Sequence, residues 1–258
     1  MLEEKIRNYI KTQKGNVAVA VKDLKSNMKI RINGDMEFPS ASTIKVSIMS
    51  ELFNKINEGA YKLDDKIKIT EEMKTDGDGI LKELNLGHTF TIKEICTLMI
   101  ILSDNMATNI LINMLGMDNI NSNIKNLGMK KTRLQREMMD SQAANEGRDN
   151  FTTADDFSHI LELTYKGENV NKTYSNMMMD ILKKQQVKGR LDLYLPEETV
   201  IAHKTGDLDS LEHDGGIVYL PDREYIICVL TNKVKSNKDG REIIGSISKM
   251  VYDEMSVN

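Results

Sequence analysis

The stretch FPSASTIK, residues 38–45, places a serine and a lysine three positions apart, at Ser42 and Lys45. We expect a helix to begin at Ser42 and to run to about Glu58, so that both side chains share one face. A serine at a helix start has unpaired backbone N–H groups beside it, which can stabilise a developing oxyanion. Lys45 can deprotonate the hydroxyl if burial or a cationic neighbour lowers its pKa. The alternative is a serine that only caps the helix, followed by a solvated lysine.

A second motif, Ser103-Asp104-Asn105, lies where two expected helices meet. In the catalytic interpretation, Ser103 carries a proton toward a leaving nitrogen, while Asn105 bonds Lys45 or a substrate amide. Asp104 is expected to point away and to stabilise the turn. The alternative is purely structural, because serine, aspartate and asparagine favour turns in any protein.

A third motif, Lys204-Thr205-Gly206, is expected to end a strand. Lys204 and Thr205 can bind a substrate carboxylate, and Lys204 can also be the cationic neighbour that lowers the pKa of Lys45. Gly206 leaves room for a substrate to approach the backbone. The alternative is an edge strand that ends in a lysine, a common way to prevent edge-to-edge pairing. The three motifs in this order favour acyl transfer through a serine.

Strand patterns occur near both chain ends, and mainly helical patterns lie between them. The expected strands cover residues 17–21, 28–32, 200–204, 216–220 and 225–231. The expected helices cover residues 3–12, 42–58, 91–102, 107–115, 152–165, 176–186 and 238–255. Residues 129–150 are expected to form a long polar loop, which is unusual enough to suggest a function. We therefore predict an α/β fold, with an antiparallel sheet built from both chain ends.

The chain divides into two expected lobes. Residues 1–40 and 195–258 form the α/β lobe, and residues 41–194 form an inserted all-α lobe that carries the nucleophile helix. A chain of 258 residues is long enough to bury a full core in this arrangement. Nothing in the sequence demands an oligomer, so we expect a monomer.

Composition disfavours several partners and cofactors. The net charge of −4 gives no reason to expect nucleic acid or an anionic membrane surface. The longest apolar run, residues 98–102, is far too short to cross a bilayer. Cys96 and Cys228 lie in apolar runs and look like buried hydrophobic residues, and the four histidines lack metal-ligand spacing. No secretory signal is visible, so we expect a cytoplasmic protein as written, or a secreted one if a leader was removed.

The strings FPxxSTxK, SDN, TRLxR, AHKTG and HDxGIVYLPD together resemble the class A serine β-lactamases, which belong to the penicillin-recognising serine hydrolases. The resemblance extends over nearly the whole chain. It implies a β-lactamase-like fold, no cofactor and an acyl-enzyme formed on Ser42. It also implies an oxyanion hole made by the backbone N–H groups of Ser42 and Asp207. The implied substrate-binding residues are Asn105, Lys204, Thr205, Gly206 and Asp207.

The sequence departs from the family in the loop TRLQREMMD, residues 132–140. The family places a glutamate two residues after the second arginine, and this glutamate holds the water that hydrolyses the acyl-enzyme. Here that position is Met138, which cannot accept a proton, and Glu137 lies one residue earlier. Glu137 is the candidate replacement base. The alternative for Glu137 is a solvent-facing carboxylate paired with Arg133 or Arg136.

Asp207 is a second departure, because the family commonly has a small or hydroxylated residue after the KTG motif. A carboxylate beside Lys204 would repel an anionic substrate if it pointed inward. If it points away, only its backbone N–H contributes to the site.

These observations lead to three functional hypotheses, all with a small-molecule substrate. The first is a hydrolase of the class A β-lactamase type that opens the β-lactam amide, with slow deacylation as one outcome, and so confers antibiotic resistance. The second is a penicillin-binding, DD-peptidase-like or esterase-like enzyme acting on a D-alanyl peptide or another acyl compound. The third is a sensor that traps a β-lactam without releasing it.

Overall fold

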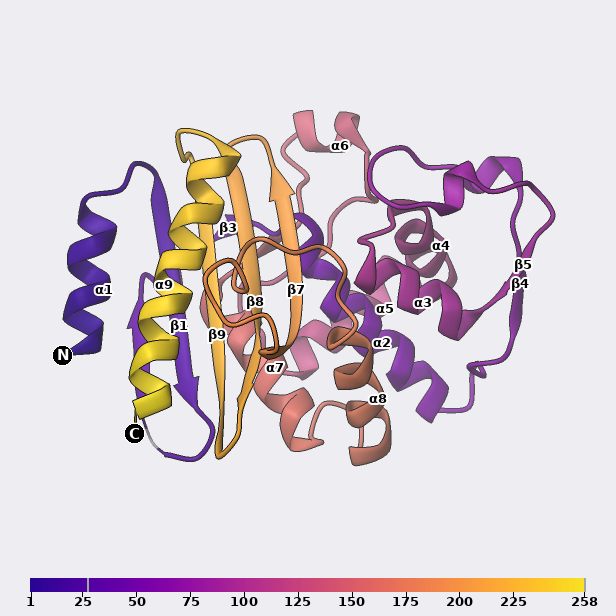
Figure 1. Ribbon diagram of the computed structural model, residues 1–258. Coiled ribbons are helices and arrows are strands. Elements are labelled where there is room, and N and C mark those ends of the chain that lie inside the picture. Colours follow the sequence, from indigo (N-terminus) through magenta and orange to yellow (C-terminus); the bar gives the residue numbers. More distant parts are fainter. Residues whose placement is uncertain (27, 258) are drawn as a thin grey trace.

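The computed structural model describes residues 1–26 and 28–257, and its main feature is a five-stranded antiparallel sheet (Figure 1). The strands follow the order β2-β1-β9-β8-β7 across the sheet. Their bounds are β1 Asn16–Asp23, β2 Lys29–Ile32, β7 Val200–Leu208, β8 Leu211–Leu220 and β9 Arg223–Asn232. Because β1 pairs with β9, the two chain ends share one sheet, and the predicted fold class is confirmed.

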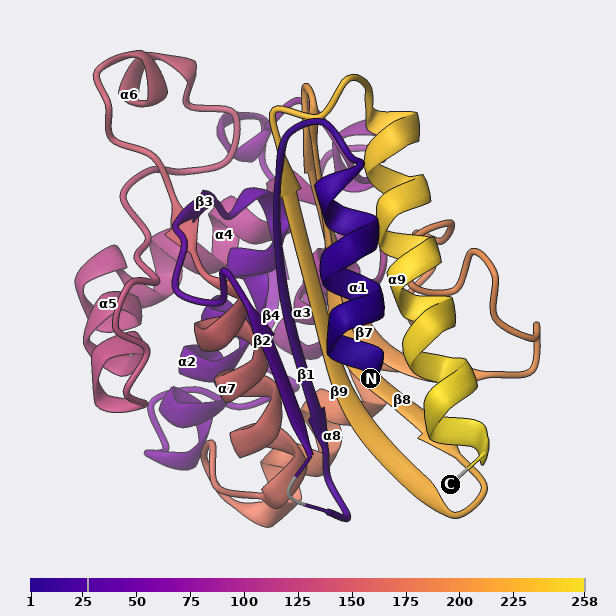
Figure 2. The same cartoon turned by 90° about the vertical axis from the view of Figure 1, so that its left-hand side faces the viewer.

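The two faces of the sheet are covered by different layers of helix. Alternate residues of a strand point to opposite faces. The valines of β1 share an apolar cluster with α1 (Leu2–Lys11) and α9 (Asn237–Val257), which lie side by side on one face in Figure 2. Ala18 and Ala20 instead belong to a second, larger cluster that includes the helices on the other face. The same strand therefore contributes to both cores.

The helices of the second layer lie between β2 and β7 in sequence. They are α2 Lys45–Asn57, α3 Ile92–Ile101, α4 Asn105–Leu115, α5 Met117–Asn126, α6 Ser141–Asn145, α7 Ala154–Lys166 and α8 Lys172–Leu182. Three short 3-10 helices accompany them, namely η1 Ala41–Ile44, η2 Glu71–Met73 and η3 Leu81–Glu83. Two small strand pairs complete the layer, β3 Phe38–Pro39 with β6 Phe151–Thr152 and β4 Lys66–Lys68 with β5 Thr89–Thr91. The β3–β6 pair holds the chain immediately before the predicted nucleophile.

Several predicted helix starts were wrong: α4 and α7 each begin two residues from the predicted position, α5 was not predicted, and two starts differ by more. Ser42 lies in the 3-10 helix η1, and the α-helix that was expected to begin there begins at Lys45. Helix α8 begins at Lys172, not at residue 176, because the side chain of Asn171 caps it and accepts a hydrogen bond from the Tyr174 backbone N–H at 3.0 Å. The expected polar loop also contains a short helix, α6.

The strands at the C-terminal end are longer than predicted, so the KTG motif does not end a strand. The pairing of β7 with β8 continues through Gly206, opposite His213, to Leu208, opposite Leu211. Lysine, glycine and aspartate are weak strand signals, and the hydrogen-bonded ladder with β8 overrides them here. Among the described helices, none has the length and apolar character needed to cross a bilayer. Cys96 and Cys228 are buried and free, as predicted.

Candidate active site

Ser42 lies in η1, which packs directly against β7. A Cβ atom built on Gly206 would lie only 2.9 Å from the backbone nitrogen of Ser42. Glycine at this position therefore allows the strand to approach the nucleophile turn closely. Ala41 precedes the serine with a φ of +45°, a conformation that is uncommon for a residue with a side chain. The backbone segments expected to form the oxyanion hole thus lie against each other.

His213 of β8 holds the segment that leads into the nucleophile turn. Its Nε2 lies 2.8 Å from the carbonyl oxygen of Pro39, and its Nδ1 lies 2.8 Å from that of Glu212. Burial lowers the pKa of His213 to about 4, so the ring is neutral at pH 7 and donates one N–H at a time. The ring also packs edge-on against Phe38, with the centroids 5.7 Å apart. Sequence reasoning gave this histidine no role.

The three predicted motifs meet at the hydroxyl of Ser103. Lys45 Nζ lies 2.7 Å from the Ser103 carbonyl oxygen, 2.9 Å from Asn105 Oδ1 and 3.2 Å from Ser103 Oγ. Lys204 Nζ lies 3.1 Å from the same Ser103 Oγ. Ser103 has a φ of +56°, so the turn that presents its hydroxyl to both amines adopts a strained backbone conformation. No hydrogen bond reaches Ser42 Oγ within the described part of the chain.

Burial controls the charge of both lysines, since each side chain is 0 % exposed. Burial and the neighbouring charge of Lys204 hold the pKa of Lys45 well below its ordinary value. Burial lowers the pKa of Lys204 to about 7, against the opposing effect of Asp214 and with a further lowering by Arg190. An unprotonated Lys45 can accept a proton, and a protonated Lys204 can attract an anion.

Asp104 points away from the two amines and fixes the turn between α3 and α4. Its carboxylate caps α4 by accepting from the Ala107 backbone N–H at 2.8 Å. It also accepts from the backbone N–H groups of Ile80 and Leu81, at 2.7 and 2.9 Å. The aspartate therefore ties the Ser103 turn to the preceding loop, in agreement with its expected structural role.

A cavity of about 380 Å³ includes Ser42 and Asn105 in its wall. The loop before α6 forms another part of this wall through Met138, whereas Glu137 is not among the described residues that line it. Asn109 of α4 fixes Met138 from both sides. It accepts from the Met138 backbone N–H at 2.8 Å and donates to the Met138 carbonyl at 3.1 Å. Met138 itself is 8 % exposed.

The two arginines of the loop pair with carboxylates other than that of Glu137, although Arg136 Nη1 donates to the Glu137 backbone carbonyl at 3.0 Å. Arg133 donates to Glu37 at 2.9 Å, and Arg136 donates to Asp149 at 2.8 Å. In the part of the chain that the structure describes, the ion pair considered for Glu137 is therefore not formed with either arginine. The half-buried Glu137 side chain has no salt-bridge partner among these residues.

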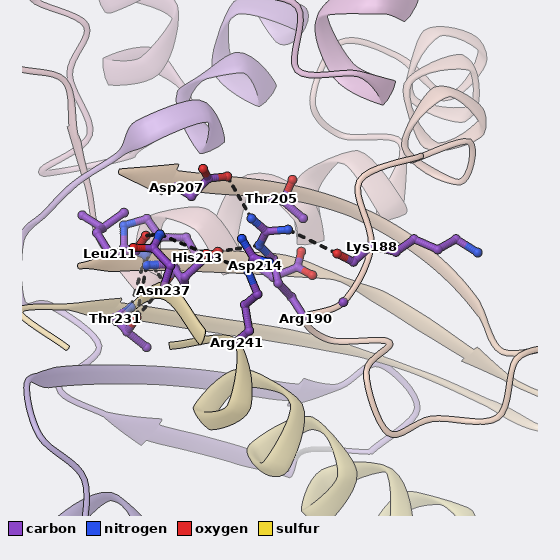
Figure 3. Close-up of polar contacts among 12 residues, drawn as sticks. Lys188, Arg190, Thr205, Asp207, Leu211, His213, Asp214, Thr231, Asn237 and Arg241 are labelled. Carbon is purple, nitrogen blue, oxygen red and sulfur yellow. Dashed lines mark hydrogen bonds and ion pairs between the residues drawn. The ribbon is translucent and has the colours of Figure 1, made fainter. Parts of the chain in front are cut away.

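Asp207 also lines the cavity, and its side chain is held by Arg190 (Figure 3). Arg190 is 3 % exposed and donates to Asp207 Oδ1 at 2.8 Å and to Glu212 Oε2 at 2.7 Å. The other oxygen of Glu212 accepts from Arg241 Nε at 2.9 Å. The sequence analysis missed Arg190, because no motif surrounds it and its partners come from distant strands.

The described residues contain no group of three or more histidine, cysteine, aspartate or glutamate side chains placed to hold a metal ion. The nearest histidine to the KTG motif in sequence, His203, uses its Nδ1 to bond Asp214 at 2.9 Å. The chemistry that this site offers is that of a hydroxyl nucleophile, two buried amines and a bridging hydroxyl.

Comparisons with known proteins agree with this chemistry. A family model described as the beta-lactamase enzyme family matches residues 1–255. Beta-lactamase VEB-1 of Pseudomonas aeruginosa is 26 % identical over an alignment of 265 positions, gaps included. The alignment covers 96 % of this chain and 88 % of that protein. A beta-lactamase structure from Sphaerobacter thermophilus has a TM-score of 0.92 and 28 % identity, with 98 % and 96 % of the two chains covered. A mutant of PBP-A in which glutamate replaces a leucine, solved as the acyl-enzyme complex with penicillin G, has a TM-score of 0.91 and 26 % identity, with 98 % and 96 % covered. This chain belongs to the beta-lactamase enzyme family and is a serine hydrolase of the class A β-lactamase type.

Proposed function

We propose that this protein is acylated on Ser42 by β-lactams and releases the opened product slowly. The observation that carries the proposal is that Met138, at the position expected for the family's glutamate, lines the cavity together with Ser42. Asp140 of the same loop also lines the cavity, and its carboxylate caps α6 by accepting from the Ala143 backbone N–H at 2.9 Å. The family's glutamate at this place activates the water that hydrolyses the acyl-enzyme. A methionine thioether cannot accept that proton. On this proposal, Lys45 and Ser103 serve the first half of the reaction, and the second half lacks the base that the family has at this position.

Acylation begins when the neutral amine of Lys45 takes the proton of the Ser42 hydroxyl and Oγ attacks the β-lactam carbonyl carbon. The backbone N–H groups of Ser42 and Asp207 bind the resulting oxyanion. When the intermediate collapses, the amide C–N bond breaks and Ser103 passes a proton to the leaving nitrogen. The 3.2 Å contact between Lys45 Nζ and Ser103 Oγ gives the proton a direct route from base to relay.

The remaining predicted residues position the reactants. Asn105 holds the Lys45 amine through the 2.9 Å hydrogen bond to its Oδ1 and presents its side chain to the cavity. Lys204 and Thr205 supply the attraction for a substrate carboxylate, and Gly206 permits the close approach of β7. Nothing in the sequence demands an oligomer, so we propose that a monomer is active.

Glu137 is the candidate base for any deacylation that occurs. Its use requires the loop to shift by one residue, against the two hydrogen bonds that Asn109 makes with the Met138 backbone. Loss of a general base typically slows a step by ~10²–10⁴-fold. We therefore expect the acyl-enzyme to accumulate.

A second function on the same site is also supported by Met138. A site that acylates without an efficient deacylation base can serve a D-alanyl peptide or a small ester, or it can retain a β-lactam as a sensor does. The likeness to PBP-A, a mutant of which was solved as its acyl-enzyme with penicillin G, supports testing both possibilities.

Intact-mass spectrometry over time, after the purified protein is mixed with penicillin G, tests the proposal. We expect an adduct of the mass of the intact penicillin that persists for many minutes, and none with Ser42→Ala. An adduct that appears and then decays while the substrate is rapidly consumed would show full turnover and would refute slow release. The absence of any adduct, in a folded protein, would refute acylation by β-lactams. Parallel incubation with a D-alanyl-D-alanine peptide and a thioester assigns the second function.

A further inference from the structure

The wall of the active-site cavity carries more negative than positive charge. Asp78, Asp140 and Asp207 line it. Among the described lining residues the one cationic side chain is Arg136, and it donates to Asp149 at 2.8 Å. An approaching substrate therefore meets carboxylates before it meets an unpaired cation.

Lys204, the expected anchor for an anion, lies behind this wall. It is fully buried and is not among the described residues that line the cavity. Its Nζ donates to the Thr205 carbonyl at 2.8 Å and lies 3.1 Å from Ser103 Oγ. Burial lowers the pKa of Lys204 to about 7, so near neutral pH its amine is only partly protonated. Its attraction for a carboxylate is correspondingly reduced.

Asp207 lies on the same face of β7 as Thr205, because residues two apart in a strand point to the same face. The rise of the strand separates their Cα atoms by about 7 Å. Figure 3 shows both side chains along this strand, with Arg190 beside them. The 2.8 Å hydrogen bond from the buried Arg190 fixes the Asp207 carboxylate, which remains 39 % exposed. Arg190 also donates to Glu212 Oε2 at 2.7 Å, and Arg241 donates to the other oxygen of Glu212 at 2.9 Å. Arg190 therefore contacts both carboxylates, while Glu212 has Arg241 as a second partner.

We infer that Asp207 is a specificity-determining residue that disfavours acyl donors with a carboxylate beside the scissile amide. The site then favours donors that are neutral or cationic at this position. The inference rests on the proposed acylation of Ser42, and it concerns only which acyl donors react fastest. Its physical basis is the repulsion between the fixed Asp207 carboxylate and a substrate carboxylate placed at Thr205.

The test compares penicillin G with its methyl ester, which lacks the carboxylate charge but keeps the same scissile amide. The second-order rate of adduct formation is measured by intact mass for the wild type and for Asp207→Asn. Asp209→Asn is the matched control, because Asp209 lies between β7 and β8, is exposed and is not among the described lining residues of the cavity. Asp207→Ser repeats the charge removal with a smaller side chain, and melting temperatures verify folding.

We expect Asp207→Asn and Asp207→Ser to accelerate acylation by the free acid about fivefold to tenfold and to leave the ester within about twofold, since only the acid is repelled. Asp209→Asn should change neither rate. Equal effects on acid and ester, or no effect on the acid, would overturn the inference while leaving acylation of Ser42 intact. If neither compound formed an adduct with any variant, the proposed function would fail and the inference with it.

Discussion

The groups for acylation and the loop for deacylation differ in how completely they are built. Around Ser103 Oγ, the amines of Lys45 and Lys204 lie 3.2 and 3.1 Å away and are fully buried. In the loop before α6, the residue at the position expected for the family's glutamate is Met138, which lines the cavity with its neighbours Met139 and Asp140. Hydrogen bonds hold both regions, since Asn109 makes two with the Met138 backbone and the SDN motif makes several with the two amines.

This difference shows that a loop held in one conformation still needs a proton acceptor before it can act as a general base. On the proposed mechanism, loss of one proton acceptor leaves the first chemical step untouched, because acylation and deacylation draw on different side chains. We therefore expect the kinetic consequence to be confined to the lifetime of the acyl-enzyme.

Replacement of the acylation base should give the largest effect. Lys45→Met keeps the length of the side chain but removes the proton acceptor, so we expect adduct formation on Ser42 to slow by up to about 10⁴-fold. This rate is measured by intact-mass spectrometry on samples quenched at successive times after mixing with saturating penicillin G. Lys55→Met is the matched control on the same helix, α2, and should acylate like the wild type. Rapid acylation of Lys45→Met would show that another group activates the nucleophile.

Restoration of a carboxylate in the loop should have the next largest effect. Met138→Glu should speed decay of the acyl-enzyme by about 10²-fold or more, because it adds a general base to the cavity wall. Glu137→Gln, which removes the neighbouring carboxylate, should change the decay little. The measurement is the loss of the adduct after removal of free penicillin. If Glu137→Gln slows decay and Met138→Glu does not speed it, Glu137 is the working base.

The sequence predicted the acylating region well because its signals are local or lie in strong patterns. The valines and isoleucines of the terminal strands predicted the shared sheet, and Thr91 predicted the start of α3. The structure adds that Glu94 completes a capping box there. The three short motifs predicted which side chains would meet. Each of these inferences needs only a few neighbouring residues.

The deacylation loop and the wall of the cavity could not be predicted in the same way. The inward position of Met138 depends on Asn109, which is 29 residues away in sequence. The orientation of Asp207 depends on Arg190 and Glu212, which reach it from other elements. Long-range hydrogen bonds of this kind leave no local pattern, so a shift of one residue between Glu137 and Met138 could not be resolved before the structure.

The pH dependence of acylation should reveal the charge of Lys204. Its pKa of about 7 means that it is cationic below this pH and neutral above it, whereas an ordinary lysine stays charged to about pH 10. We therefore expect acylation by penicillin G to fall about threefold to tenfold from pH 7 to pH 9, as the attraction for the substrate carboxylate is lost. The methyl ester should lack this decline. Ser42→Ala supplies the blank for spontaneous hydrolysis, and a flat profile for the free acid would refute the assignment.

The smallest expected effect concerns the rigidity of the loop. Asn109→Ala removes the two hydrogen bonds to the Met138 backbone and should lower the free energy of unfolding by about 1–3 kcal/mol. Asn121→Ala is a close control, because Asn121 accepts from the Leu134 backbone N–H at 2.8 Å and donates to the Leu134 carbonyl at 2.7 Å. Both variants should lose similar stability in urea unfolding, and both should acylate at the wild-type rate. Only Asn109→Ala should alter the lifetime of the acyl-enzyme, by releasing the part of the loop that lines the cavity. Equal lifetimes in the two variants would mean that the rate of release is set by the absence of a base alone and does not depend on how the loop is held.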